Sequence, residues 1–201
     1  AIDLDAEALE RHPAHKRVTR LHAEVDGAAL AELPSCDAIF VGNFSIGYLH
    51  ERPDLVRYLR RCVWRLKRRG IFVCDTYGGA STFTTGTVKR EHRTPDGRRV
   101  IYTWEQRDAD PITGLVTNAM HFQVDRDGDI ELRIADAFVY QWRIWSLPEL
   151  TDAMLEAGFR DVEIYDKVPS AVDGDGNVYM APVEDGSDLE ESFIVCVAAR
   201  V

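Results

Sequence analysis

A short unbroken apolar run, Ala38 to Val41, is the sequence feature that most constrains the fold of this chain. An apolar run of this length, stopped by Gly42, predicts a strand that is buried on both faces, as in a parallel sheet. Ligands of open α/β sheets bind outside the carboxyl ends of the strands, so the segment after Val41 is the first candidate for a binding site. Side chains able to form hydrogen bonds follow there: Asn43, Ser45, Tyr48 and His50.

The clearest helix is predicted from Pro53 to Arg69. Apolar residues recur at helical spacing on one face and arginines fill the other, which is typical of a helix that packs on a sheet and exposes its polar side. Proline suits the first turn of a helix, and Gly70 suits the residue after its end. Residues 71–75 are then predicted to form the next buried strand.

The first residues of the chain predict the end of a strand that leads at once into a helix, with Asp5 as the N-cap. Residues 18–25 predict a second short strand. The resulting order is strand, helix, strand, strand, helix, strand, which predicts a Rossmann-like, doubly wound α/β fold with right-handed crossovers. A domain rarely begins at the end of a buried strand, so we expect further residues upstream of Ala1.

The composition changes between residues 80 and 145, where β-branched and aromatic residues become frequent. Three segments rich in these residues, separated by good turn sequences, predict an antiparallel β-sheet inserted into the α/β fold. These segments are residues 100–107, 115–124 and 138–145.

The residues after the inserted sheet return to the α/β pattern. Ser146 and Glu149 predict a capping box at the start of a helix, and two β-rich segments at 159–165 and 192–200 predict a closing pair of strands. The chain therefore divides into three parts: an α/β core (1–79), an inserted sheet (80–145), and a C-terminal helix with a closing hairpin (146–201).

The charge balance bears on the partners of the chain. Lys and Arg total 24 against 34 Asp and Glu, a formal charge of −10, which argues against nucleic acid or an anionic membrane as the main partner. No apolar run approaches the roughly 18 residues that span a bilayer, and no secretory signal is apparent, so we expect a cytoplasmic protein. The scattered cysteines predict free thiols: Cys36, Cys62, Cys74 and Cys196.

Five segments in fixed order resemble the class I S-adenosylmethionine-dependent methyltransferases, over most of the chain outside the inserted sheet. Asp3 matches the acidic residue that ends the family's second strand, and Glu24, followed by Val25, matches the one after its third strand. Each match alone is a weak signal, and the specificity comes from the order of all five. The remaining matches are residues 37–48, 66–73, and 145–150 with 157–159.

One part of the family pattern has no counterpart: the first strand with the glycine-rich loop that follows it. In the family this strand lies at the centre of the sheet, between the second and fourth strands. Without it, residues 39–41 would expose unpaired backbone along an apolar edge, which favours association with another chain as a homo-oligomer. We interpret the sequence as most of a methyltransferase without its first strand and helix.

The resemblance implies that S-adenosylmethionine is the cofactor and that a small molecule is the methyl acceptor. It also implies that the core, residues 1–79, binds the cofactor and that the inserted sheet, residues 80–145, covers the acceptor site. Asp3 would accept hydrogen bonds from the ribose, and Glu24 would lie near the adenine amino group. The implied cofactor-binding residues are Asp3, Leu4, Glu24, Val25, Asn43, Phe44 and Ser45. The candidate acceptor-binding residues are Tyr77, Glu105, Trp142 and Arg143.

Three residues are candidates for catalysis: Tyr48, His50 and His121. The resemblance places Tyr48 near the transferring methyl group, and either histidine could act as a general base if the acceptor must lose a proton. A structural role stays open for each histidine, as does core packing for the aromatic residues and helix capping for Asp3. No metal site is predicted, because the calcium-like loop at 173–177 is followed by Val178 where a glycine is required.

Two other functions stay open. A nicotinamide-dependent dehydrogenase also carries an acidic residue at the end of its second strand, although the late helix and closing hairpin fit that fold less well. A non-catalytic binding or scaffolding module would keep the fold without the cofactor loop. Titration with S-adenosylhomocysteine and with NAD would distinguish the three functions.

Overall fold

The computed structural model describes residues 1–11, 15–24, 33–166 and 171–201, so Val25 lies outside the described residues. Its centre is a four-stranded sheet in the order β3-β4-β12-β9. Strands β3 and β4 are parallel, and β12 runs antiparallel to both of its neighbours. The strands are β3 (Cys36–Val41), β4 (Leu66–Gly79), β9 (Asp161–Asp166) and β12 (Ser192–Arg200).

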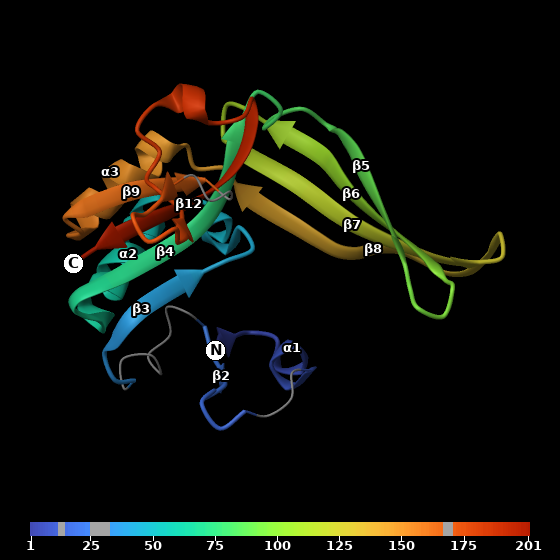
Figure 1. Cartoon of the computed structure of the whole chain (residues 1–201), viewed down its shortest axis with the longest axis horizontal. Helices are drawn as coiled ribbons and strands as arrows, with labels where there is room; N and C mark the ends of the chain where they lie inside the picture. The colour runs from blue at the N-terminus through green and yellow to red at the C-terminus, as the bar shows by residue number, and fades with distance from the viewer. Residues whose placement is uncertain (12–14, 25–32, 167–170) are drawn as a thin grey trace.

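Helices α2 (Arg52–Arg65) and α3 (Leu147–Ala157) pack together on one face of this sheet (Figure 1). Alternate residues of β4 point into the core between sheet and helices, because successive side chains of a strand face opposite sides. The core consists largely of fully buried apolar residues: Leu55, Leu59, Phe72, Cys74, Trp145, Leu150, Met154, Val197 and Ala199.

The N-terminal residues form a small separate unit, in which β1 (Ile2–Asp3) and β2 (Leu21–His22) pair in parallel and flank α1 (Ala6–Arg11). Asp5 caps α1 as predicted, since its Oδ1 accepts the Ala8 N–H at 3.0 Å. Within the described part of the chain, β3 pairs only with β4, and Phe40 on β3 is 70% exposed. The apolar edge expected at residues 39–41 is therefore unpaired there.

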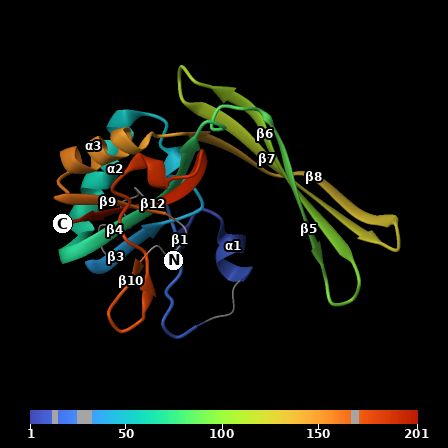
Figure 2. The same cartoon turned by 45° about the horizontal axis from the view of Figure 1, so that its top comes forward.

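The inserted sheet is present and has four strands, whereas the sequence predicted three. Its antiparallel strands are β5 (Gly86–Arg93), β6 (Arg99–Asp110), β7 (Leu115–Arg126) and β8 (Asp129–Arg143). Figures 1 and 2 show this sheet as an arm that projects away from α2 and α3. Strand β5 was missed because it is an edge strand whose residues are all exposed, with mostly charged side chains in place of an apolar face.

Two element boundaries differ from the prediction. Helix α2 ends at Arg65 and β4 begins at Leu66, because Leu66 already pairs with Cys36 of β3 ahead of an irregularity in the register. The predicted second strand, 18–25, forms only over Leu21–His22 in the described residues.

Helix α3 agrees with the prediction from the sequence. The capping box of Ser146 and Glu149 is formed, and Gly158 lies in the left-handed region (φ 112°).

The α/β fold with a Rossmann-like sheet and an inserted antiparallel sheet is confirmed. The remaining short elements are η2 (Ser45–Tyr48), β10 (Ala171–Val172), β11 (Val178–Tyr179) and η3 (Gly186–Asp188). The four cysteines are free thiols. None of the helices in the described part of the chain has the length and apolar character needed to cross a membrane.

Candidate functional site

The carboxyl ends of the parallel strands carry the side chains that the sequence assigns to a cofactor. Asp3 ends β1 opposite His22 of β2, and Glu24 follows two residues later, so the two carboxylates belong to one edge. Burial raises the pKa of the Tyr48 hydroxyl above its usual value, and the neighbouring Tyr140 and the Asp3 carboxylate raise it further. Asp3 is therefore close enough to Tyr48 to act on it electrostatically.

The segment after β3 is held in an unusual conformation by a residue that the sequence analysis did not single out. Asn43 and Phe44 both have positive φ angles, 59° and 57°, which are costly for residues other than glycine. Asp75 on β4 accepts the backbone N–H of Asn43 at 2.8 Å and that of Phe44 at 2.6 Å. An acidic residue at the end of the predicted strand 71–75 was the only sequence signal for this role.

Aromatic rings connect this loop to the inserted sheet. Phe44 lies edge-on to Tyr77 of β4, with ring centroids 5.0 Å apart, and to Trp142 of β8 at 5.5 Å. Tyr140 stacks on Trp142 at 4.7 Å, and Tyr48 meets the same indole edge-on at 6.3 Å. Trp142 is fully buried, so it forms the wall of this aromatic cluster and is not an exposed contact surface.

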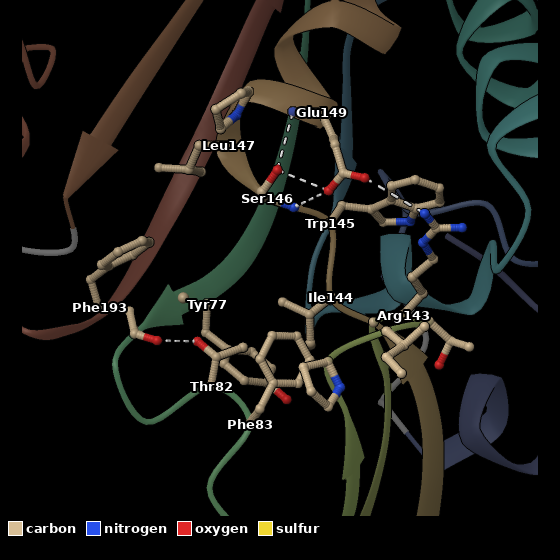
Figure 3. A pocket seen from close by; sticks show the side chains of 17 residues that line it. Tyr77, Thr82, Phe83, Arg143, Ile144, Trp145, Ser146, Leu147, Glu149 and Phe193 are labelled. Atoms are coloured by element: carbon tan, nitrogen blue, oxygen red, sulfur yellow. Dashed lines mark hydrogen bonds and ion pairs between the residues drawn. The ribbon is translucent and has the colours of Figure 1, made fainter.

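A cavity of about 490 Å³ opens beside Tyr77, at the carboxyl end of β4 (Figure 3). Its wall comes from the β4–β5 connection, the β6–β7 turn, the start of α3, and Phe193 of β12. A cavity of this size lies within the range of small-molecule sites. The side chains that Figure 3 labels around it are Tyr77, Thr82, Phe83, Arg143, Ile144, Trp145, Ser146, Leu147, Glu149 and Phe193.

Arg143 lines this cavity and also connects the segments around it. Its guanidinium lies 3.8 Å from the ring centre of Trp145, donates to the carbonyl oxygen of His50 at 2.8 Å, and is 3.6 Å from Glu149. Burial favours the neutral form of Glu149, but the Ser146 hydrogen bonds and the charge of Arg143 outweigh it, so its pKa lies below the usual value. Arg143 and Glu149 are thus a fixed pair of charges at the cavity.

The two histidine candidates differ in position, since His50 binds the backbone of β8 between Tyr140 and Trp142 and His121 lies on the other face of the inserted sheet. His50 hydrogen-bonds through Nε2 to the carbonyl oxygen of Gln141 at 3.0 Å. On β6 and β7, Trp104 pairs with Met120 on the aromatic face, whereas Glu105 pairs with Ala119 and therefore belongs to the opposite face, together with His121. The structure thus does not bring His121 and Glu105 to the side of Tyr48, a result that strand alternation alone could have indicated.

His121, Glu105 and Asp136 have their ligand atoms within 4.8 Å of one another, close enough to hold a metal ion. However, Arg107 pairs with Glu105 at 2.8 Å and with Asp136 at 2.6 Å, and His121 Nδ1 accepts the backbone N–H of Asp136. The guanidinium already supplies the positive charge at this position. We interpret His121, Glu105, Asp136 and Arg107 as an ion-pair network that stabilises the inserted sheet.

Comparison with known proteins gives matches at the level of structure only. No protein-family model matches the sequence, and neither does any curated protein. Among solved structures, DesVI from Streptomyces venezuelae matches with a TM-score of 0.65 and 18% identity over 98% of this chain and 72% of that one.

Two further solved structures match over the full length of this chain. An S-adenosylmethionine-dependent methyltransferase from Clostridium acetobutylicum has a TM-score of 0.62 and 17% identity, with 73% of its own length covered. The sugar N-methyltransferase KedS8 from Streptoalloteichus has a TM-score of 0.62 and 16% identity, with 70% covered. With the fold and the position of the strand ends described above, this chain has the fold of the class I S-adenosylmethionine-dependent methyltransferases.

Proposed function

We propose that this chain is a methyltransferase that uses S-adenosylmethionine and acts on a small-molecule acceptor. The single observation that carries the proposal is the proximity of Asp3, at the end of β1, to Tyr48 in the loop after β3. We therefore assign the acidic strand end and the loop of a second parallel strand to one rim, since open α/β sheets bind nucleosides at such a rim.

The residues on this rim fit the cofactor. Asp3 uses Oδ1 to accept the Asp5 N–H at 2.9 Å, and within the described residues its Oδ2 has no hydrogen-bond partner, so it can accept from a ribose hydroxyl. Leu4 beside it is 64% exposed and offers an apolar surface to the nucleoside. Glu24 lies on the same edge. Val25, the other proposed contact, falls outside the described residues.

The acceptor would bind between the aromatic cluster and the cavity beside Tyr77. When bound, S-adenosylmethionine supplies an electrophilic methyl group for an in-line displacement, in which positioning can contribute roughly 7–11 kcal/mol. Phe44, Tyr48 and Trp142 would exclude water from this region, and Tyr77 and Arg143 would orient the acceptor. Tyr48 remains our candidate for the residue next to the transferring methyl group.

An amine is the acceptor group that this site suits best. Among the described residues that line the cavity, Glu149 is the only carboxylate, and its Oε2 is committed to the capping box at 3.0 Å from the Ser146 nitrogen. A hydroxyl acceptor would need a general base, whereas a neutral amine attacks with its free electron pair. Two of the structural matches, a sugar N-methyltransferase and an amino pentose methyltransferase, agree with an amine on a sugar-like molecule.

Calorimetric titration of the purified chain with S-adenosylhomocysteine and with NAD tests this function. We expect heat with S-adenosylhomocysteine only, and Asp3→Asn to weaken that binding about tenfold or more, since a charge-assisted hydrogen bond contributes about 1.5–3 kcal/mol. Asp129→Asn, at the far end of the arm, is the matched control and should bind normally. Heat with NAD alone would support a dehydrogenase, and heat with neither ligand a scaffold.

A further inference from the structure

Two buried amides lie behind the Tyr77 side chain, which itself lines the cavity (Figure 3). Gln106 and Asn118 face each other across β6 and β7, and they are 8% and 0% exposed. The Tyr77 oxygen is 3.5 Å from Oε1 of Gln106 and 3.4 Å from Nδ2 of Asn118. Polar groups this deep in a sheet are uncommon unless hydrogen bonds satisfy them.

The donors and acceptors in the hydrogen bonds of Gln106, Tyr77 and Asn118 can be assigned by starting from Gln106. Nε2 of Gln106 donates to the carbonyl oxygens of Thr82 at 2.7 Å and Thr84 at 3.0 Å, so Oε1 must face Tyr77. The Tyr77 hydroxyl has one proton, and Gln106 Oε1 accepts it. The Tyr77 oxygen is then left to accept from Asn118 Nδ2.

This order leaves an acceptor without a donor. Oδ1 of Asn118 is buried and has no hydrogen-bond partner within the described part of the chain. Turning the amide around would not help, because two amide oxygens would then compete for the single Tyr77 proton and the NH₂ group would lose its acceptor. The other buried side-chain atom without a partner there is the indole nitrogen Nε1 of Trp142, which is a donor.

We infer that the Tyr77 oxygen, backed by the buried amides of Gln106 and Asn118, presents a hydrogen-bond acceptor to the methyl acceptor and thereby selects an amine that still carries N–H hydrogens. Tyr77 contacts the amine from the cavity, and Gln106 and Asn118 are positioning residues that keep the Tyr77 proton turned away from it. Holding the N–H hydrogens leaves the electron pair of the nitrogen free to form the new bond. This inference rests on the proposed methyltransferase function and adds its selecting group.

Nuclear magnetic resonance of the ¹⁵N-labelled full chain tests this selection with simple probes. Butylammonium carries N–H donors, tetramethylammonium has the same charge without them, and butan-1-ol is an uncharged donor of similar length. We expect butylammonium to shift the side-chain amide signals of Asn118 and Gln106, and tetramethylammonium to leave them in place. In Gln106→Leu the Tyr77 proton is freed, and we expect butylammonium to bind at least fivefold more weakly.

A stability measurement separates this role from a purely structural one. Asn118→Leu removes the unpaired acceptor, so we expect an unchanged or higher melting temperature together with loss of the butylammonium response. Asn118→Asp, the isosteric control, should lower the melting temperature because it buries a charge. Equal shifts from tetramethylammonium, no shift from butylammonium, or a clearly lower melting temperature for Asn118→Leu would each overturn the inference.

The outcome is independent of the test of the proposed function. Asn118 belongs to β7 of the inserted sheet, whereas Asp3 and Glu24 belong to the β1–β2 edge, so the response to the amine probes and the affinity for S-adenosylhomocysteine are measured separately. Binding of S-adenosylhomocysteine without selection among the amine probes would remove the role of Tyr77 and Asn118 and leave the methyltransferase proposal in place.

Discussion

Asp75 is the residue on which the shape of the candidate site most depends. Its carboxylate holds the N–H groups of Asn43 and Phe44, two consecutive residues in the left-handed region. We expect Asp75→Asn to lower the free energy of unfolding by about 2–3 kcal/mol, because an amide has only one oxygen to accept two charge-assisted hydrogen bonds. Urea unfolding followed by circular dichroism measures the change.

The matched control for Asp75 is Asp37→Asn. Asp37 is 84% exposed in its side chain and, within the described residues, its carboxylate pairs only with Lys67 at the surface, so its loss should change stability by less than about 1 kcal/mol. An Asp75→Asn protein as stable as the control would contradict the role given to Asp75 in fixing the loop.

The buried thiol of Cys62 makes the free energy of unfolding depend on pH in the alkaline range. Burial raises the pKa of its thiol to about 12, against about 8.5 in an unfolded chain. The folded state therefore keeps its proton where the unfolded state loses it, so this contribution is complete below about pH 8.5 and is lost as the pH rises toward 12. We expect the free energy of unfolding to fall over this window, and Cys62→Ala to reduce the fall.

Alkylation with iodoacetamide at pH 8 provides a second measurement for Cys62. The half-buried Cys36 should react in the native protein, whereas Cys62 should react only after unfolding, as the thiolate is the reactive form. Rapid native modification of Cys62 would contradict the burial described for it.

At the scale of elements, the start of α3 carries a stabilising cap. The Ser146 side chain accepts the Glu149 N–H, and the Glu149 carboxylate accepts the Ser146 N–H at 3.0 Å. We expect Ser146→Ala to lower the free energy of unfolding by about 1 kcal/mol. Asp152→Ala on the exposed side of the same helix serves as the control and should be neutral or stabilising, since alanine favours helix.

The elements that were predictable from the sequence are those with a local cause. The capping residues of α3 and the apolar face of α2 lie within a few residues of one another, so their pattern determines the structure. Strand β5 has no such pattern, because its stability comes from pairing with β6. Likewise, the roles of Asp75 and Asn118 depend on partners far along the chain, and spacing alone could not reveal them.

At the scale of the whole molecule, the inserted sheet has two unlike faces. Ion pairs such as Arg107 with Asp136 occupy one face. The other continues the aromatic cluster outward along the arm, where Phe138 stacks on Tyr140. Its apolar side chains include Val88, Tyr102, Trp104, Phe122, Ile134 and Phe138. An exposed apolar face of this extent marks an interaction surface.

We predict that this apolar face associates with a second copy of the chain, since an identical face is always available to it. Neighbouring residues on β8 provide a matched pair of variants: Phe138 is 47% exposed on the apolar face, and Val139 is 50% exposed on the opposite face. Light scattering after size exclusion should show a concentration-dependent dimer that Phe138→Lys abolishes and Val139→Lys preserves, because only the former places a charge inside the interface. A wild-type chain that stays monomeric at about 100 µM would contradict this prediction, as would equal effects of the two substitutions. Either result would show that the apolar face has another role. The aromatic cluster would then have to be enclosed by something other than a second copy.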